Sequence, residues 1–316
     1  MKKHDFGPRR IGELLDDAIA LVIANWRTIV PVAAVVVLPV AAAYSVVASF
    51  YIRSFVEILG GGASAFSSTT PSSAEITILL TATMMQGLGL LYAGSKAVFD
   101  AGMYSSADEL LRAERRPLKE MLSSGFRSAL PLIAVQLLAG LLAGTVAIVV
   151  GVGVALIAFG VMFVSPIAGA IGVVIAELAG LTAGLVAGAF LFLAAPIAVI
   201  EKDIIGSLTR SFALVRRHFW RIVLVVIAAG LLGAQFESAL AAPTIVRSII
   251  TGVQSPESLI GQMAWGWKVF DGLAQGIAMA LVLPFTTAVS LLTYFDLRAR
   301  DEGMDLVVRA RALLPG

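Results

Sequence analysis

The sequence predicts an all-α, polytopic membrane protein with six transmembrane helices and amphipathic helices at its cytoplasmic side. Composition gives the first indication: 59% of the 316 residues are hydrophobic and 14% are charged, and the mean hydropathy is +0.93. Soluble domains carry about 25% charged residues, so this chain lacks the polar surface that a globule in water needs. Long apolar runs and an uneven distribution of basic residues give the other two indications.

The apolar runs are long enough to cross a membrane. A spanning helix needs about 20 apolar residues to cross a hydrocarbon core of about 30 Å. The stretch 129–200 is ambiguous, because it could hold two long spans or three short ones. With two spans there, broken near Ser165 and Pro166, the predicted spans are residues 28–52, 76–98, 129–160, 167–200, 222–243 and 270–295.

The basic residues favour six spans over seven. Lys and Arg accumulate on the cytoplasmic side of membrane proteins. Six spans place both termini and the tail 297–316 in the cytoplasm, and the cytoplasmic segments then hold 20 of the 23 Lys and Arg residues. A third span within 129–200 would move the basic cluster at 202–221 outside and remove this asymmetry. The polar N-terminus also lacks the pattern of a cleavable signal peptide.

Two segments have the spacing of amphipathic helices. In the segment 11–27, apolar residues recur every three or four positions, and acidic residues occupy the other side. A helix with such a polar side cannot span, so we expect it to lie along the cytoplasmic interface or to pack under the bundle. A second stripe runs from Ile205 to Phe219, and a third, weaker one begins at Leu118.

Aromatic and basic residues near the ends of these stripes predict contacts with lipid headgroups. Trp26 and Trp220 are each followed by an arginine, and tryptophan favours the headgroup level of the bilayer. Basic side chains on the same segments attract anionic lipids. We therefore expect headgroup contacts at Arg210, Arg217, Trp26 and Trp220.

The stripes also suggest an internal repeat. Each stripe precedes two spans, so the chain divides into three units at 11–98, 118–200 and 205–297, each with one interfacial helix and two transmembrane helices. Alternatively, three membrane entries carry similar patterns without a common origin. The outer segment 58–75 is rich in Gly, Ser, Thr and Pro, a composition typical of a flexible loop.

One carboxylate stands within the apolar stretch and is the main candidate for an intramembrane site. Glu177 interrupts the run 129–200, and an ionisable group at membrane depth marks a functional site by default. If the fourth span begins near Ile167, Glu177 is inside the bilayer and needs a partner such as Gln136. If the span begins near Ala176, Glu177 lies at the outer surface instead.

Motifs for catalysis are not found in the sequence. The chain has no cysteine and only two histidines, neither with a metal-ligand partner at helical spacing, and no hydrolase or phosphate-binding motif occurs. We therefore expect no enzymatic activity, no cofactor and no metal site. The basic residues lack the interleaved aromatic residues of a nucleic-acid surface, so nucleic acid is not an expected partner.

Three stretches carry a resemblance to a known family. They are residues 10–27, from Arg10-Ile-Gly-Glu to Asn25-Trp26-Arg27, residues 195–221, and residues 284–303. The chain resembles the membrane domain that is fused to some bacterial glycerophosphodiester phosphodiesterases. The resemblance implies a six-helix module of the bacterial cytoplasmic (inner) membrane. It does not imply the phosphodiesterase activity, because the sequence lacks the soluble catalytic barrel with its paired histidines.

Two functions remain open from the sequence, with an intramembrane enzyme as a third and least favoured class. The first is a membrane scaffold or accessory protein that binds lipid or a partner protein through its cytoplasmic helices. The second is a transporter or channel-like protein for a small solute or a lipid, suggested by the repeat, the proline-containing spans and Glu177. A polar cavity at membrane depth, lined by Glu177 and Gln136, would favour transport.

Overall fold

The computed structural model describes residues 9–61, 73–112, 117–162, 165–254 and 265–303, and every regular element within these ranges is a helix. The predicted helical class is confirmed, and six of the helices are long and apolar enough to cross a membrane, which indicates a multi-pass membrane protein. The helices are α1 (Ile11–Ala24), α2 (Trp26–Gly61), α3 (Ser73–Ser105), α4 (Ala107–Leu111), α5 (Leu118–Met162), α6 (Pro166–Leu191), α7 (Ala194–Ile200), α8 (Ile204–Arg217), α9 (Phe219–Gln254) and α11 (Trp265–Glu302).

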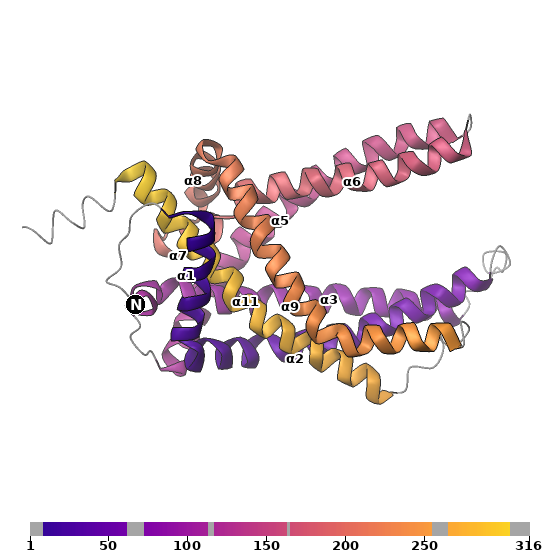
Figure 1. The fold of residues 1–316 in the computed structure, drawn as a ribbon, viewed down its shortest axis with the longest axis horizontal. Coiled ribbons are helices and arrows are strands. Elements are labelled where there is room, and N and C mark those ends of the chain that lie inside the picture. The colour runs from indigo at the N-terminus through magenta and orange to yellow at the C-terminus, as the bar shows by residue number, and fades with distance from the viewer. Residues whose placement is uncertain (1–8, 62–72, 113–116, 163–164, 255–264, 304–316) are drawn as a thin grey trace, which may run out of the picture.

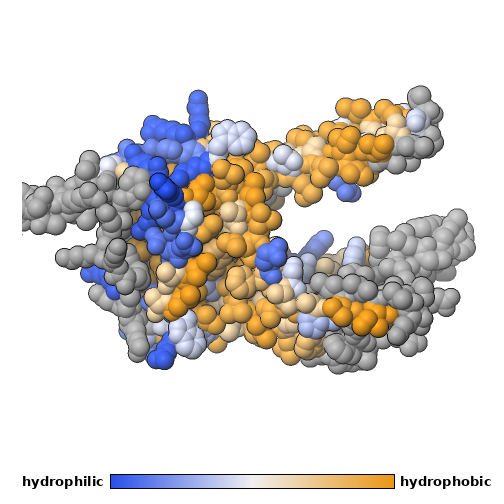
Figure 2. Space-filling view, in the orientation of Figure 1, coloured by the Kyte–Doolittle hydropathy of each residue, from blue (hydrophilic) through white to orange (hydrophobic). Residues whose placement is uncertain are grey.

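The long helices form two bodies that diverge from one end of the molecule. Helices α2, α3, α9 and α11 run together, while α5 and α6 form a separate hairpin (Figure 1). The short helices α1, α4, α7 and α8 gather with the C-terminal part of α11 where the bodies meet, and we call this region the basic end. Hydrophilic surface is concentrated there, whereas the hairpin is largely hydrophobic (Figure 2).

The first and third predicted units begin in a similar way, but the second does not. Helix α1 stops at Asn25, whose buried side chain donates to the Leu21 and Leu110 carbonyls at 3.0 and 3.2 Å, and α2 begins one residue later. Helix α8 likewise stops at His218, just before α9. The third stripe, in contrast, is the first part of α5, which runs unbroken from Leu118 to Met162. The three-unit repeat stays a prediction.

The two predicted stripes fall within helices α1 and α8, and each helix buries only part of its stripe in the bundle, so their amphipathic role at the membrane stays a prediction. Helix α1 buries Leu14, Ala18 and Leu21 and leaves Trp26, just after it, 55% exposed. Helix α8 buries Ser207, Ser211, Leu214 and Val215. Ile205 and Phe212, both in the predicted stripe, stay 87% and 48% exposed. Because each helix buries one side in the bundle and keeps apolar side chains outside, both can also face lipid.

Several helices and loops begin or end at residues other than those predicted. Helix α2 continues to Gly61 and α3 begins at Ser73, so both ends of the predicted loop 58–75 are helical, while 62–72 lies outside the described residues. The predicted tail 297–316 starts inside α11, where Leu297 is fully buried, and residues 304–316 are not described. The predicted span 167–200 is two helices, α6 and α7, because the helix breaks at 192–193.

A pair of glycines brings α3 and α5 together near the basic end. A Cβ on Gly125 would clash with the Val98 carbonyl oxygen, and one on Gly102 would lie 2.9 Å from the Met121 carbonyl oxygen. Small residues allow such close approach where lipid gives no hydrophobic drive for helix association. The contact fixes the distance between α3 and α5 at the point where the candidate site lies.

We predict that Gly125→Ala forces α3 and α5 apart and lowers the free energy of unfolding by about 1–3 kcal/mol, the usual cost of overpacking. Thermal unfolding of the purified protein in detergent measures the effect. Gly144→Ala on the same helix is the matched control, since nothing lies within 4 Å of a Cβ built there. Equal melting temperatures for the two variants would contradict the close contact.

Candidate functional site

A carboxylate on α3 is the centre of a buried polar cluster. The Asp100 side chain is almost completely buried, and its Oδ2 accepts hydrogen bonds from Lys96 Nζ at 2.5 Å and Gln136 Nε2 at 2.8 Å. Its Oδ1 accepts from Thr287 Oγ1 of α11 at 2.7 Å. A buried charge is tolerated only when it is paired and hydrogen-bonded. The Asp100 cluster (Lys96, Asp100, Gln136 and Thr287) thus joins three spanning helices.

A cavity of about 450 Å³ lies beside this cluster, between α3, α5, the α6–α7 break and α11. We call it the Asp100 cavity. All of its lining residues lie within segments that are apolar enough to span a membrane. The lining is Tyr92, Ala93, Lys96, Asp100, Tyr104, Gln136, Ala139, Leu191, Phe192, Ala195, Thr286, Thr287 and Ser290.

Side-chain hydroxyls donate to backbone carbonyls at the helix break next to this cavity. Pro196 in the first turn of α7 has no backbone N–H, so it cannot donate to the Phe192 carbonyl. Ser290 Oγ donates to that carbonyl at 3.4 Å, and Ser211 Oγ donates to the Phe190 carbonyl at 2.7 Å. Irregular backbone within a membrane occurs where it is buried in protein or lines a cavity, and this break does line one.

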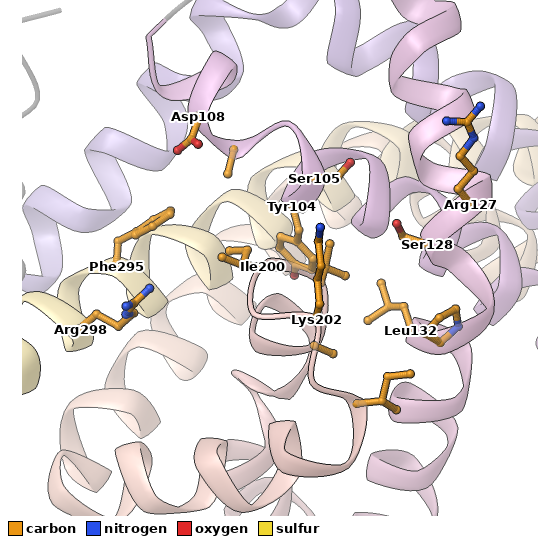
Figure 3. A pocket seen from close by; sticks show the side chains of 15 residues that line it. Tyr104, Ser105, Asp108, Arg127, Ser128, Leu132, Ile200, Lys202, Phe295 and Arg298 are labelled. Carbon is orange, nitrogen blue, oxygen red and sulfur yellow. The ribbon is translucent and has the colours of Figure 1, made fainter.

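A second cavity, of about 670 Å³, opens at the basic end (Figure 3). We call it the basic cavity, because Arg127 of α5, Lys202 between α7 and α8, and Arg298 of α11 line it, with Asp108 as the one acidic residue. The other lining residues are Tyr104, Ser105, Ala107, Ser128, Pro131, Leu132, Ala198, Val199, Ile200, Ile204 and Phe295.

The three cations of the basic cavity differ in whether nearby side chains neutralise their charge. Arg298 donates to Glu302 Oε2 at 2.8 Å and to the Tyr294 hydroxyl at 3.0 Å. Among the described residues, Arg127 and Lys202 make no side-chain hydrogen bond or ion pair. Lys202 also has a backbone φ of 58°, a left-handed conformation that is uncommon outside glycine and is concentrated at functional sites. Within the described part of the chain, two cations of this cavity are therefore left without an anionic partner.

Tyr104 lines both cavities and is itself only 4% exposed. The two cavities are therefore next to each other at this side chain.

The C-terminal part of α11 holds the basic end together through ion pairs. The buried Asp296 carboxylate accepts from Arg221, from Arg300 at 3.1 Å and from the Arg9 backbone N–H at 2.7 Å. Arg210 lies between Glu201 at 3.1 Å and Glu302 at 2.5 Å.

Arg217 and His218 both contact Asp301, at 3.4 and 2.9 Å. The charges of the predicted headgroup contacts Arg210 and Arg217 are thus balanced within the protein, whereas the neighbouring Trp220 is 74% exposed. The headgroup contacts stay predictions.

The structure does not bring Glu177 and Gln136 together. Glu177 is exposed on α6, close to where Gly180 packs against Gly151 of α5. At 1.5 Å per helical residue, that level of α5 is about 22 Å from Gln136. Gln136 does line a polar cavity, but its partner is Asp100.

Sequence reasoning missed Asp100 because it lies at the basic end of a span, where charges are common. The available signal was its i, i+4 spacing from Lys96, which makes a pair on one helical face. The described residues contain no group of three or more His, Cys, Asp or Glu side chains that could hold a metal ion.

A comparison with models of protein families shows to which family the chain belongs. The model described as "Domain of unknown function (DUF7847)" matches residues 82–297, more than half of the sequence. The chain belongs to the DUF7847 family. The DUF7847 region contains the whole Asp100 cavity and all of the basic cavity except Arg298. Nothing in this match links DUF7847 to the membrane domains of phosphodiesterases. No curated protein and no solved structure matched the sequence.

Proposed function

We propose that this protein is an integral membrane scaffold or accessory protein, without enzymatic activity, that binds an anionic membrane lipid in its basic cavity. The observation that carries the proposal is a pair of cations, Arg127 and Lys202, that have no ion-pair partner among the described residues and lie beside Arg298 in a cavity of about 670 Å³. The guanidinium group of arginine and the ammonium group of lysine are common ligands of phosphate in proteins. A phosphate ester in the cavity would be placed between α5, α11 and the α7–α8 turn.

Nearby features support a lipid as the source of the phosphate. Trp26 and Trp220 are exposed at the basic end, and tryptophan favours the level of the headgroups. Basic pockets between transmembrane helices on the cytoplasmic side are typical binding sites for anionic headgroups. The basic residues thus support a location in a cytoplasmic (inner) membrane with the basic end inside, and the family resemblance supports a bacterial one.

The double variant Arg127→Ala with Lys202→Ala tests this proposal. Each basic residue near an anionic headgroup contributes about 1 kcal/mol, so we expect the variant to bind phosphatidylglycerol about 30-fold more weakly. Native mass spectrometry of the purified protein with added phosphatidylglycerol measures the affinity. Free inorganic phosphate is the second arm, because competition by phosphate at low concentration would identify a soluble ligand instead of a lipid.

The matched control is Arg216→Ala, which also removes an exposed cation from the basic end but not from the cavity. We expect the control to bind phosphatidylglycerol as the unaltered protein does. If the control and the double variant lose affinity equally, the basic residues act only as a diffuse charge and the proposed site is wrong.

The proposed orientation has its own test, because the chain contains no cysteine. We expect a membrane-impermeant maleimide to label Ser67→Cys in intact cells and to label Arg216→Cys only after the cells are permeabilised. Ser67 belongs to the predicted outer loop, outside the described residues, and Arg216 is exposed at the basic end. Labelling of Arg216→Cys in intact cells would show that the basic end faces outward and would contradict the proposed orientation.

Transport is the second candidate function, and the Asp100 cavity favours it. Broken helices that line polar cavities within the membrane are typical of the binding sites of secondary transporters. Purified protein in liposomes would then accumulate or release a small polar solute, and Asp100→Asn would abolish the flux. A solute panel that shows no flux above protein-free liposomes would leave the accessory function as the account of this chain.

A further inference from the structure

The Asp100 cavity has spare hydrogen-bonding capacity but no net charge. Lys96 and Asp100 compensate each other at 2.5 Å. The Tyr92 hydroxyl makes no hydrogen bond to another residue that the structure describes. Gln136 uses its amide N–H on Asp100 and keeps its carbonyl oxygen, and Lys96 has further N–H groups. The cavity can therefore both donate to and accept from a polar ligand without adding a charge.

One part of the cavity is apolar, and the cavity lies where the two helical bodies separate. Ala93, Ala139, Leu191, Phe192 and Ala195 form this apolar part, and the hydroxyl-bearing residues Tyr104, Thr286 and Ser290 complete the lining. Beyond it the α5–α6 hairpin diverges from α3 (Figure 1), and open space lies between the hairpin and the other body (Figure 2). The surface of the hairpin in that view is predominantly hydrophobic. In a bilayer, such a space is accessible to lipid tails and not to water.

We infer that the Asp100 cavity binds an uncharged lipid with a hydroxyl headgroup, such as a diacylglycerol, whose tails extend between the hairpin and the other helices. The hydroxyl donates to the Gln136 carbonyl oxygen and accepts from Tyr92 or Lys96. A charged headgroup is disfavoured, because it would enter without a counter-charge next to an already neutral pair. This site has a lining distinct from that of the basic cavity, although Tyr104 contributes to both.

The test uses the full-length protein in phosphatidylcholine vesicles with two photoreactive probes, a diacylglycerol and a phosphatidylglycerol that carry the same diazirine acyl chain. We expect the diacylglycerol probe to label peptides of α3 and α5, and unlabelled diacylglycerol to compete. Tyr92→Phe removes one hydrogen bond and leaves the Asp100 cluster intact, so it should lower labelling about fivefold. Ala139→Trp fills the cavity and should abolish labelling.

The double variant Arg127→Ala with Lys202→Ala is the matched control and should leave diacylglycerol labelling unchanged, so this inference and the proposed function fail separately. Unfolding temperatures of all variants show that each is folded. Equal labelling of the same peptides by the phosphatidylglycerol probe would overturn the inference. So would labelling by the diacylglycerol probe that survives Ala139→Trp or is insensitive to Tyr92→Phe.

Discussion

Asp100→Leu is expected to lower the free energy of unfolding by about 3–5 kcal/mol, the usual cost of removing one partner from a buried charge pair. The carboxylate accepts hydrogen bonds from Lys96, Gln136 and Thr287, and the substitution leaves all three donors without their acceptor. Because those donors come from α3, α5 and α11, the loss separates the helices around the cavity. Chemical unfolding in mixed micelles measures the change.

The control for this prediction removes the opposite charge as well. Replacing a complete buried ion pair by apolar residues is often close to neutral, so Lys96→Met combined with Asp100→Leu should regain part of the stability. A single Asp100→Leu variant as stable as the unaltered protein would show that the cluster does not hold these helices together.

Asp296→Ala is expected to have a comparable effect at the basic end, about 3–5 kcal/mol by the same reasoning. Its carboxylate is fully buried and binds Arg221 at 2.9 Å and Arg300 at 3.1 Å. It also accepts the Arg9 backbone N–H, so it ties the segment before α1 to α9 and α11. Without it, two guanidinium groups remain close together with no carboxylate between them.

Thermal unfolding and limited proteolysis of the N-terminal segment would measure this effect. Asp301→Ala is the matched control on the same helix. Asp301 is 12% exposed and pairs with the largely exposed Arg217 and with His218, so we expect a shift of at most about 1 kcal/mol. A larger loss for Asp301→Ala than for Asp296→Ala would contradict the assignment of Asp296 as the centre of the basic end.

The fold class and the number of spans could be predicted from the sequence, because both follow from the length of the apolar runs and from the distribution of charges. The ends of the helices could not. Hydropathy ends a predicted span where polar residues begin, yet α11 continues to Glu302 because its polar last turns are stabilised by ion pairs to α8 and α9. The break at 192–193 was equally hidden, since Pro196 alone does not fix where a helix stops.

The candidate site was only partly predictable. The sequence offers Gln136 only as a partner for Glu177, whereas its partner in the structure is Asp100, close in space and distant in sequence. Glu177 was more conspicuous by the same criterion, and it is exposed on the hairpin. Hydropathy cannot distinguish a buried charge from an exposed one, because that depends on which helices pack together. Free cations such as Lys202 likewise become recognisable only when their neighbours are known.

The most direct test of the central claim is an electron cryomicroscopy map of the protein in nanodiscs that contain phosphatidylglycerol. The account predicts six membrane-spanning helices and density for a phosphate group inside the basic cavity, within hydrogen-bonding distance of Arg127 and Lys202. A map in which side chains fill that cavity, with anionic headgroups only on the outer surface of α8, would contradict it.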